Sequence, residues 1–174
     1  MRRYFAIILI TLTMFSLCAC KQDNTEFNEP VTFFYCCDVT NESVSDDTFH
    51  NVFVAEIREG SGYKDDLPSL LTLYLQGPHS EELVSPFPTG LRVVSAYADS
   101  ERVLIVFSDA IASLTGLDLT IACSCLALTV FDSNECDYIE IAAETKPLDE
   151  QESIVITRDS LVLADDTYSF SKEG

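Results

Sequence analysis

The chain has 174 residues, of which 47% are hydrophobic, and its 29 acidic and 10 basic side chains give a formal net charge of −19. This length and apolar fraction are sufficient for one folded domain with a buried core. A charge this negative excludes nucleic acid as a partner and disfavours an electrostatic contact with anionic lipid.

Residues 1–19 have the pattern of a bacterial lipoprotein signal peptide. Arg2 and Arg3 form a short basic region, and the apolar stretch at 5–17 falls short of the roughly 20 residues that span a bilayer. The sequence Leu-Cys-Ala-Cys then resembles a lipobox, with Cys20 as the lipid-attachment residue. We expect a chain anchored by lipid on the extracytoplasmic face of a bacterial membrane, with a net charge of −21 once both arginines are removed. The alternatives are a plain secretory signal and an uncleaved signal anchor.

Residues 20–30 are short and polar, and we expect them to form a tether that is followed by a single domain over 31–174. The domain begins with a strand predicted at 31–38, where aromatic residues follow Pro30. A second strand is predicted at 51–59, where apolar and charged residues alternate. Its expected core face carries Phe53, Ala55 and Ile57, and its expected solvent face carries Glu56 and Arg58.

The clearest helix is predicted to begin after Asp65 or Asp66 and to end at Gly77. The acidic residue caps the first turn, which holds Pro68, and the glycine can adopt the left-handed conformation that ends a helix. Apolar residues spaced three and four apart form one buried stripe, made of Leu67, Leu70, Leu71, Tyr74 and Leu75.

A loop is predicted at 79–90, where prolines are frequent, and two strands follow at 91–97 and 102–108. Four polar or small residues separate these strands, so we expect a hairpin. Its most regular apolar face carries Val103, Ile105 and Phe107.

The second helix, predicted at 116–131, is apolar on almost every side. Thr115 and Asp118 resemble a capping box at its start. Such a helix needs cover on more than one side, either from the rest of the chain or from a partner. We adopt a partner as the hypothesis, and the candidate partner-facing residues are Leu119, Leu126 and Val130.

The remaining elements are a strand predicted at 137–143 and a C-terminal hairpin formed by 153–157 and 160–164. Strands mixed with two helices indicate an α+β fold. The expected arrangement is a mixed β-sheet with two helices packed on one face, plus the short C-terminal β-hairpin.

The domain contains five cysteines, an odd number that cannot all pair within the chain: Cys36, Cys37, Cys123, Cys125 and Cys136. The first two are neighbours on a strand and point to opposite faces, and the next two lie about 200° apart around a helix, so neither pair suits one metal ion. We expect most of these five cysteines to be small, buried side chains that pack as apolar groups. One disulfide between the first strand and the second helix is the alternative, which an extracytoplasmic location would permit.

Motifs for catalysis are missing from the sequence. There is no nucleophile elbow, zinc-binding helix or phosphate-binding loop, and the only histidines are His50 and His79. We therefore expect a non-enzymatic protein with no metal and no cofactor.

Several segments resemble the GerMN domain, the sporulation and spore germination family. The resemblance covers roughly 31–157 and is carried by LYLQGP at 73–78, PTGLRVV at 88–94, VLIVFS at 103–108, the helix at 117–131 and the strand at 138–141. It implies a fold related to the ring-building motifs of spore-envelope secretion complexes. It also implies a non-catalytic role at the cell envelope, often as a lipoprotein.

The function expected from these observations is assembly with other envelope proteins, or self-association, in sporulation or spore germination. The alternative is a module that binds peptidoglycan or regulates wall hydrolases. That alternative predicts an exposed aromatic groove, for which the candidates are Tyr35, Tyr63, Tyr97 and Tyr138.

Overall fold

The structure, a computed structural model, describes residues 27–37, 53–63 and 65–161. The predicted signal peptide, Cys20, His50 and the last three residues of the predicted C-terminal hairpin lie outside this part of the chain. All statements below concern the described residues.

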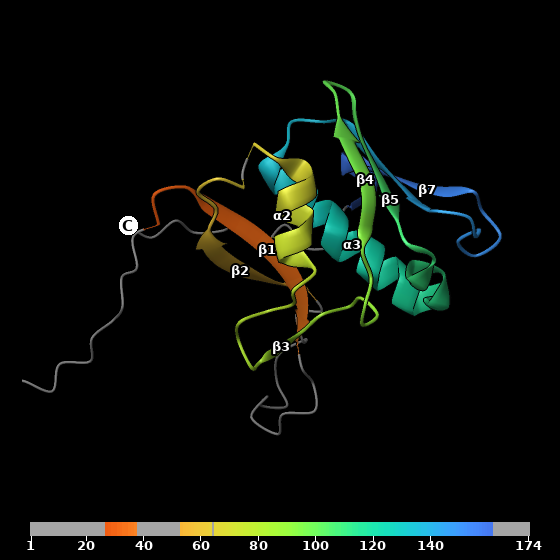
Figure 1. The fold of residues 1–174 in the computed structure, drawn as a ribbon, viewed down its shortest axis with the longest axis horizontal. Coiled ribbons are helices and arrows are strands. Elements are labelled where there is room, and N and C mark those ends of the chain that lie inside the picture. Colours follow the sequence, from red (N-terminus) through yellow and green to blue (C-terminus); the bar gives the residue numbers. More distant parts are fainter. Residues whose placement is uncertain (1–26, 38–52, 64, 162–174) are drawn as a thin grey trace, which may run out of the picture.

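The described strands form two sheets (Figure 1). The three-stranded sheet has the order β2 (Phe53–Glu59), β1 (Pro30–Cys37), β3 (Leu83–Val84) and is antiparallel. The four-stranded sheet has the order β4 (Val93–Ala98), β5 (Arg102–Phe107), β6 (Tyr138–Ala143), β7 (Ser153–Thr157). Only β5 and β6 are parallel, since α3 (Gly116–Ser133) connects them. The α+β class is confirmed, but the expected single sheet is divided into two.

Both sheets and both helices contribute to one core. β1 contributes Val31, Phe33 and Tyr35 from one face, and the four-stranded sheet contributes alternate residues of β5 and β6. The helix α2 (Leu67–Tyr74) adds the apolar stripe expected from the sequence. The helix α2 packs beside β4 and α3 packs against β1, and both can be followed in Figure 1.

The two predicted helices are confirmed, with one correction at a helix start. Asp66 caps α2 by accepting a hydrogen bond from the Ser69 N–H at 3.5 Å, and Gly77 has the expected positive φ of 90°. Thr115 makes no side-chain cap at the start of α3, so the predicted capping box is wrong. Instead, the Gly116 N–H donates to Oδ2 of Asp149 at 2.7 Å, from a turn that follows β6.

The proposed partner-facing residues of α3 are covered by the chain itself. Leu119 is 2% exposed, and Leu126 and Val130 are fully buried in the shared core. The hypothesis that they face a partner is therefore wrong, because two sheets, rather than one, surround this helix. By length and composition α3 could cross a bilayer, yet half of it is buried inside the protein, as in the core helix of a soluble domain.

The faces of β2 are reversed at its end. Ile57, expected in the core, is 57% exposed, whereas Arg58, expected in solvent, is 5% exposed. The guanidinium of Arg58 is accommodated by the polar and aromatic groups around it, as described below, so a basic side chain is buried where alternation predicted one in solvent.

The predicted C-terminal hairpin is replaced by one strand and a short 3₁₀ helix. β7 pairs with β6 along Ser153–Thr157 and so extends the four-stranded sheet. The chain then enters a short 3₁₀ helix at Arg158–Leu161 instead of turning back as a strand. A second 3₁₀ helix at Asp109–Ser113 and the short β3 were also missed by the sequence analysis.

Candidate functional site

The four-stranded sheet has one face in the core and one face open. Because side chains alternate along a strand, Val103, Ile105 and Phe107 of β5 are fully buried, while their neighbours point the other way. The cross-strand pairing continues this division over all four strands. We call the open side the outer sheet face; its residues are Ser95, Tyr97, Arg102, Leu104, Val106, Tyr138, Glu140, Ala142, Ser153, Val155 and Thr157.

The middle row of the outer sheet face carries three apolar side chains and one carboxylate. Tyr97 pairs with Leu104, which pairs with Glu140, which pairs with Val155. Tyr97 is 58% exposed and Val155 is 56% exposed, and the residues between them are partly exposed. The exposed tyrosine and valine at the two edges of this face give a partner apolar surface to bury, although Glu140 separates them.

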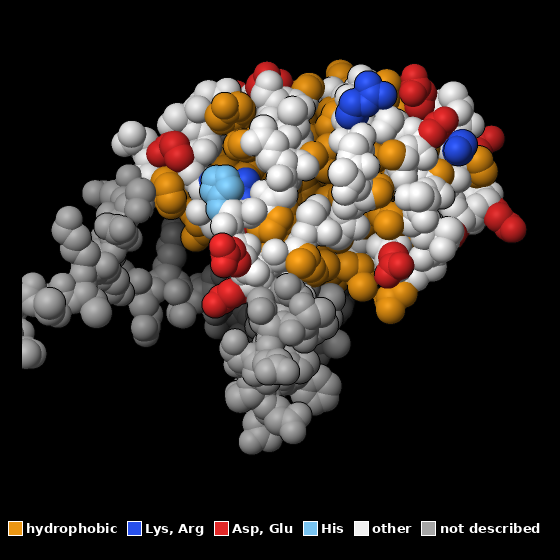
Figure 2. All heavy atoms as spheres, turned by 60° about the horizontal axis from the view of Figure 1, so that its bottom comes forward, with side chains coloured by type: hydrophobic (Ala, Val, Ile, Leu, Met, Phe, Trp, Pro, Cys, Tyr) orange, Lys and Arg blue, Asp and Glu red, His pale blue; other side chains and the backbone are white. Residues whose placement is uncertain are grey.

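Charges on the outer sheet face balance each other. Nη1 of Arg102 lies 3.5 Å from Oε2 of Glu140, and its Nε lies 3.7 Å from Oδ2 of Asp99. Glu140 also accepts a hydrogen bond from Oγ of Ser153 at 2.8 Å. The sheet face is therefore close to neutral on a protein whose formal charge is −19. On the view in Figure 2, by comparison, acidic side chains lie mostly near the outline and basic ones are few.

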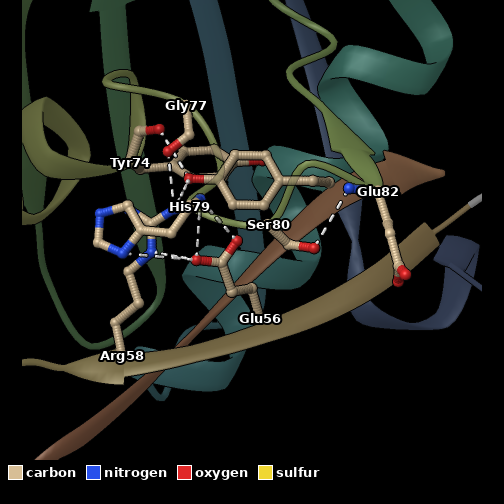
Figure 3. Close-up of polar contacts among 8 residues, drawn as sticks. Glu56, Arg58, Tyr74, Gly77, His79, Ser80 and Glu82 are labelled. Carbon is tan, nitrogen blue, oxygen red and sulfur yellow. Dashed lines mark hydrogen bonds and ion pairs between the residues drawn. The ribbon is translucent and has the colours of Figure 1, made fainter. Parts of the chain in front are cut away.

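A second polar cluster surrounds Arg58 at the junction of β2 and the end of α2 (Figure 3). Nε of Arg58 donates to Oε1 of Glu56 at 2.7 Å, and Nη2 donates to the Gly77 carbonyl at 2.7 Å and to the Tyr35 hydroxyl at 3.2 Å. The guanidinium also lies 5.1 Å from the ring centre of Phe33. Nη1 is buried and has no hydrogen-bond partner among the described residues.

This cluster holds structure together rather than presenting a reactive group. Burial raises the pKa of Glu56, but hydrogen bonds from Arg58 and from the His79 N–H outweigh it and lower the pKa. Burial also raises the pKa of Tyr35 above its ordinary value. Both groups thus keep their ordinary charge at neutral pH, and neither is prepared to exchange a proton.

The four aromatic candidates of the wall-binding alternative separate into two groups. Tyr35 is fully buried, and its hydroxyl donates to the Tyr74 carbonyl at 2.9 Å, so it cannot contact a ligand. Tyr63 is 40% exposed in the turn after β2. Tyr97 and Tyr138 both belong to the outer sheet face. Two of the four candidates therefore share one surface.

The five cysteines of the domain are free thiols in the structure. Cys36 and Cys125 lie close together, with 4.0 Å between their sulfur atoms. Burial raises the pKa of Cys123 to about 12, so it is a poor nucleophile. No group of three or more His, Cys, Asp and Glu side chains that could hold a metal occurs among the described residues.

A cleft of about 310 Å³ runs between α3 and the C-terminal part of the four-stranded sheet. Its titratable groups are Cys123 and Asp149, and the carboxylate of Asp149 is already used to cap α3. The cleft therefore holds one carboxylate, and that carboxylate accepts a hydrogen bond from the start of α3.

No family model and no characterised protein sequence matches this chain. Among solved structures, the tandem GerMN domains of the sporulation protein GerM from Bacillus subtilis match with a TM-score of 0.55 at 18% identity, over 76% of this chain and 46% of that chain. A Clostridium perfringens protein provisionally assigned as a lipoprotein matches with a TM-score of 0.46 at 14% identity, over 75% of this chain and 88% of that one.

The Bacillus subtilis match shows that this chain has the fold of a GerMN domain. The resemblance seen in the sequence is thereby confirmed for the fold. The chain spans about half the length of the tandem structure that it matches. At 18% identity the likeness is one of fold, and function has to be argued from this chain's own surface.

Proposed function

We propose that this protein is a non-catalytic, lipid-anchored component of the bacterial cell envelope that assembles with another envelope protein through the outer sheet face. Its anchor is lipidated Cys20, residues 20–30 are the tether, and residues 31–174 are the single domain. The setting that the GerMN fold favours is sporulation or spore germination. The observation that carries the proposal is the open, charge-balanced face that ends in exposed Tyr97 and Val155.

Charge favours a different protein over a second copy as the partner. Two copies of a chain with a net charge of −19 repel each other at long range. A partner with an apolar centre and a basic rim would instead be attracted by the acidic surroundings and bury the neutral face. The α3 residues that first motivated this hypothesis no longer contribute to it, because they are buried.

A photo-crosslinking amino acid placed on the full-length lipoprotein in native membranes tests this surface. We expect position 155 to give a defined cross-link to an envelope protein, and position 57 to give none. Ile57 is the matched control because it is an equally exposed apolar strand residue, at 57% against 56%, on the other sheet. A further Tyr97→Asp change should remove the cross-link. Equal labelling from positions 57 and 155, or a cross-link that survives this change, would contradict the proposal.

The anchor is tested separately. Cys20→Ala should leave the precursor uncleaved by the lipoprotein peptidase and without palmitate. Unchanged palmitate labelling would rule out Cys20 as the lipid-attachment residue.

A wall-binding module is the second candidate, because Tyr97 and Tyr138 lie on the same sheet face. Sugar rings stack on exposed aromatic side chains, and Tyr97 is more than half exposed. Retention of the protein on purified peptidoglycan, with loss of retention in Tyr97→Ala, would favour this candidate over protein assembly. Retention unaffected by Tyr97→Ala would exclude the outer sheet face as the glycan site.

A further inference from the structure

Two cysteines that are 89 residues apart in the chain meet where β1 crosses α3. Sγ of Cys36 lies 4.0 Å from Sγ of Cys125. A disulfide bond is about 2.05 Å long, so the two sulfurs need to approach by roughly 2 Å. Rotation about the Cα–Cβ bond moves a cysteine sulfur by a distance of this order, so the proposal requires no rearrangement of the fold.

A neighbouring contact fixes the alignment of strand and helix at this point. The Phe34 N–H donates to Oγ1 of the fully buried Thr129 at 3.0 Å. From this contact to the cysteine pair, the strand advances two residues, about 6.6 Å, and the helix retreats four residues, about 6 Å. These lengths match, so β1 and α3 keep Cys36 opposite Cys125 and cannot slide past each other without breaking a buried hydrogen bond.

The two thiols differ in a way that suits an ordered reaction. Cys36 is partly exposed, and a hydrogen bond from Cys125 lowers its pKa against the opposing effect of burial. Cys125 is fully buried, and its hydrogen bond to Cys36 together with burial raises its pKa. Cys36 is therefore the accessible thiol that ionises first.

We propose that Cys36 and Cys125 are a disulfide-forming pair, which closes to a covalent bond between β1 and α3 when the protein meets an oxidising disulfide. The inference goes beyond the proposed assembly function and does not depend on the outer sheet face. Only its use in the cell rests on the proposed extracytoplasmic location, since disulfides persist outside the cytoplasm.

The chemistry is two successive thiol–disulfide exchanges with a small-molecule or protein disulfide as oxidant. The Cys36 thiolate attacks one sulfur of that disulfide, forms a mixed disulfide and expels the other sulfur as a thiolate. Cys125 then loses its proton and attacks the Cys36 sulfur, which expels the second oxidant thiolate. Two protein thiols are oxidised to one disulfide, and one oxidant disulfide is reduced to two thiols.

The position of this bond gives it a mechanical role. It would join the three-stranded sheet to α3 near the end of β1, where β3 pairs only with Cys36 and Cys37. A cross-link that closes a loop of this length removes many conformations of the unfolded chain. Oxidation should therefore raise the unfolding temperature by about 5–15 °C.

The test uses the full-length lipoprotein purified in mild detergent and equilibrated with oxidised or reduced glutathione. Free thiols are counted with a mass-shifting maleimide after denaturation, and cross-linked peptides are identified by mass spectrometry without reduction. We expect oxidation to remove two free thiols and to join the peptide containing Cys36 to that containing Cys125. The bond should also form in Cys37→Ser, Cys123→Ser and Cys136→Ser, and should not form in Cys36→Ser or Cys125→Ala.

Folding is controlled within the same experiment. Cys36→Ser changes a partly exposed side chain, so its reduced form should unfold at nearly the temperature of the reduced wild-type protein, yet show no increase on oxidation. Failure of the wild-type protein to form the cross-link, or a cross-link that requires Cys123 in place of Cys125, would overturn the proposal. Because the assay uses purified protein, its outcome is independent of whether the envelope location or the assembly partner is correct.

Discussion

Arg58→Met is the substitution that most directly tests how the three-stranded sheet is held against the end of α2. Methionine keeps an unbranched apolar stem against Phe33 but removes the charge and every donor. The lost contacts are the hydrogen bonds to Glu56, Gly77 and Tyr35 described above. Glu56 would then remain as a largely buried carboxylate, 13% exposed, without its cation.

The expected cost follows from these contacts. Removing one partner of a buried ion pair costs about 3–5 kcal/mol. The cost here should be lower, because Glu56 keeps two 3.1 Å contacts from the His79 N–H and is not fully buried. The substitution also removes Nη1, a buried donor without a hydrogen-bond partner among the described residues, and this offsets part of the cost. We therefore expect a loss of about 2–4 kcal/mol in the free energy of unfolding, or about 5–15 °C in Tm.

Arg102→Met is the matched control for this measurement. Arg102 also contacts two carboxylates, but its side chain is 40% exposed and its distances are 3.5 and 3.7 Å. An exposed pair of this kind contributes at most about 1 kcal/mol. Urea unfolding of both variants, followed by circular dichroism, gives the comparison. If Arg58→Met costs no more than Arg102→Met, the buried cluster does not stabilise the junction and the reasoning fails.

Three further predictions concern single contacts. Asp149→Ala removes the acceptor for the Gly116 N–H and should cost about 0.5–2 kcal/mol by urea unfolding, whereas an unchanged midpoint would show that α3 is capped in another way. Gly60→Ala should cost about 1–3 kcal/mol or more, because its added Cβ would lie 2.3 Å from Cγ1 of Val31 and 2.7 Å from a backbone oxygen; a stable alanine variant would refute this close packing. Hydrogen bonds from Ser61 lower the pKa of Glu59 to about 2 from 4.5. The ionised carboxylate therefore stabilises the folded protein fully above pH 4.5, and this stabilisation is lost as the pH falls toward 2. Glu59→Gln should flatten the decline of Tm over this range, and an unchanged decline would contradict the assignment.

Sequence patterns located most elements because their cause is local. The spacing of apolar residues gave α2, although the helix ends at Tyr74 and not at Gly77, and alternation gave β5, whose core residues are fully buried. The long apolar run correctly gave α3 as well. These features depend on residues within a few positions of each other, so one sequence is enough to find them.

The errors arose where distant residues decide the outcome. Alternation placed Arg58 in solvent, because nothing near it in the sequence shows that Tyr35 and Gly77 supply acceptors in the interior. The cap of α3 comes from Asp149, 33 residues away, so local pattern suggested Thr115 instead.

The candidate surface was missed for the same reason. Tyr97 and Tyr138 were each identified as aromatic candidates, but their common face follows from the parallel pairing of β5 with β6, which a sequence pattern does not reveal. The pairing of strand and helix cysteines was foreseen only as an alternative to isolated thiols.

The hydrogen bond from Phe34 to Thr129 has a consequence for the order in which the chain can fold. The two residues are 95 positions apart, so β1 cannot reach its final environment until α3 has been synthesised. At about 5–20 residues per second, that interval is roughly 5–20 s. During it, an aromatic strand is without its final cover and is prone to aggregation. Early pairing of β1 with β2, or a chaperone that holds the N-terminal segment, would protect the nascent chain until α3 arrives.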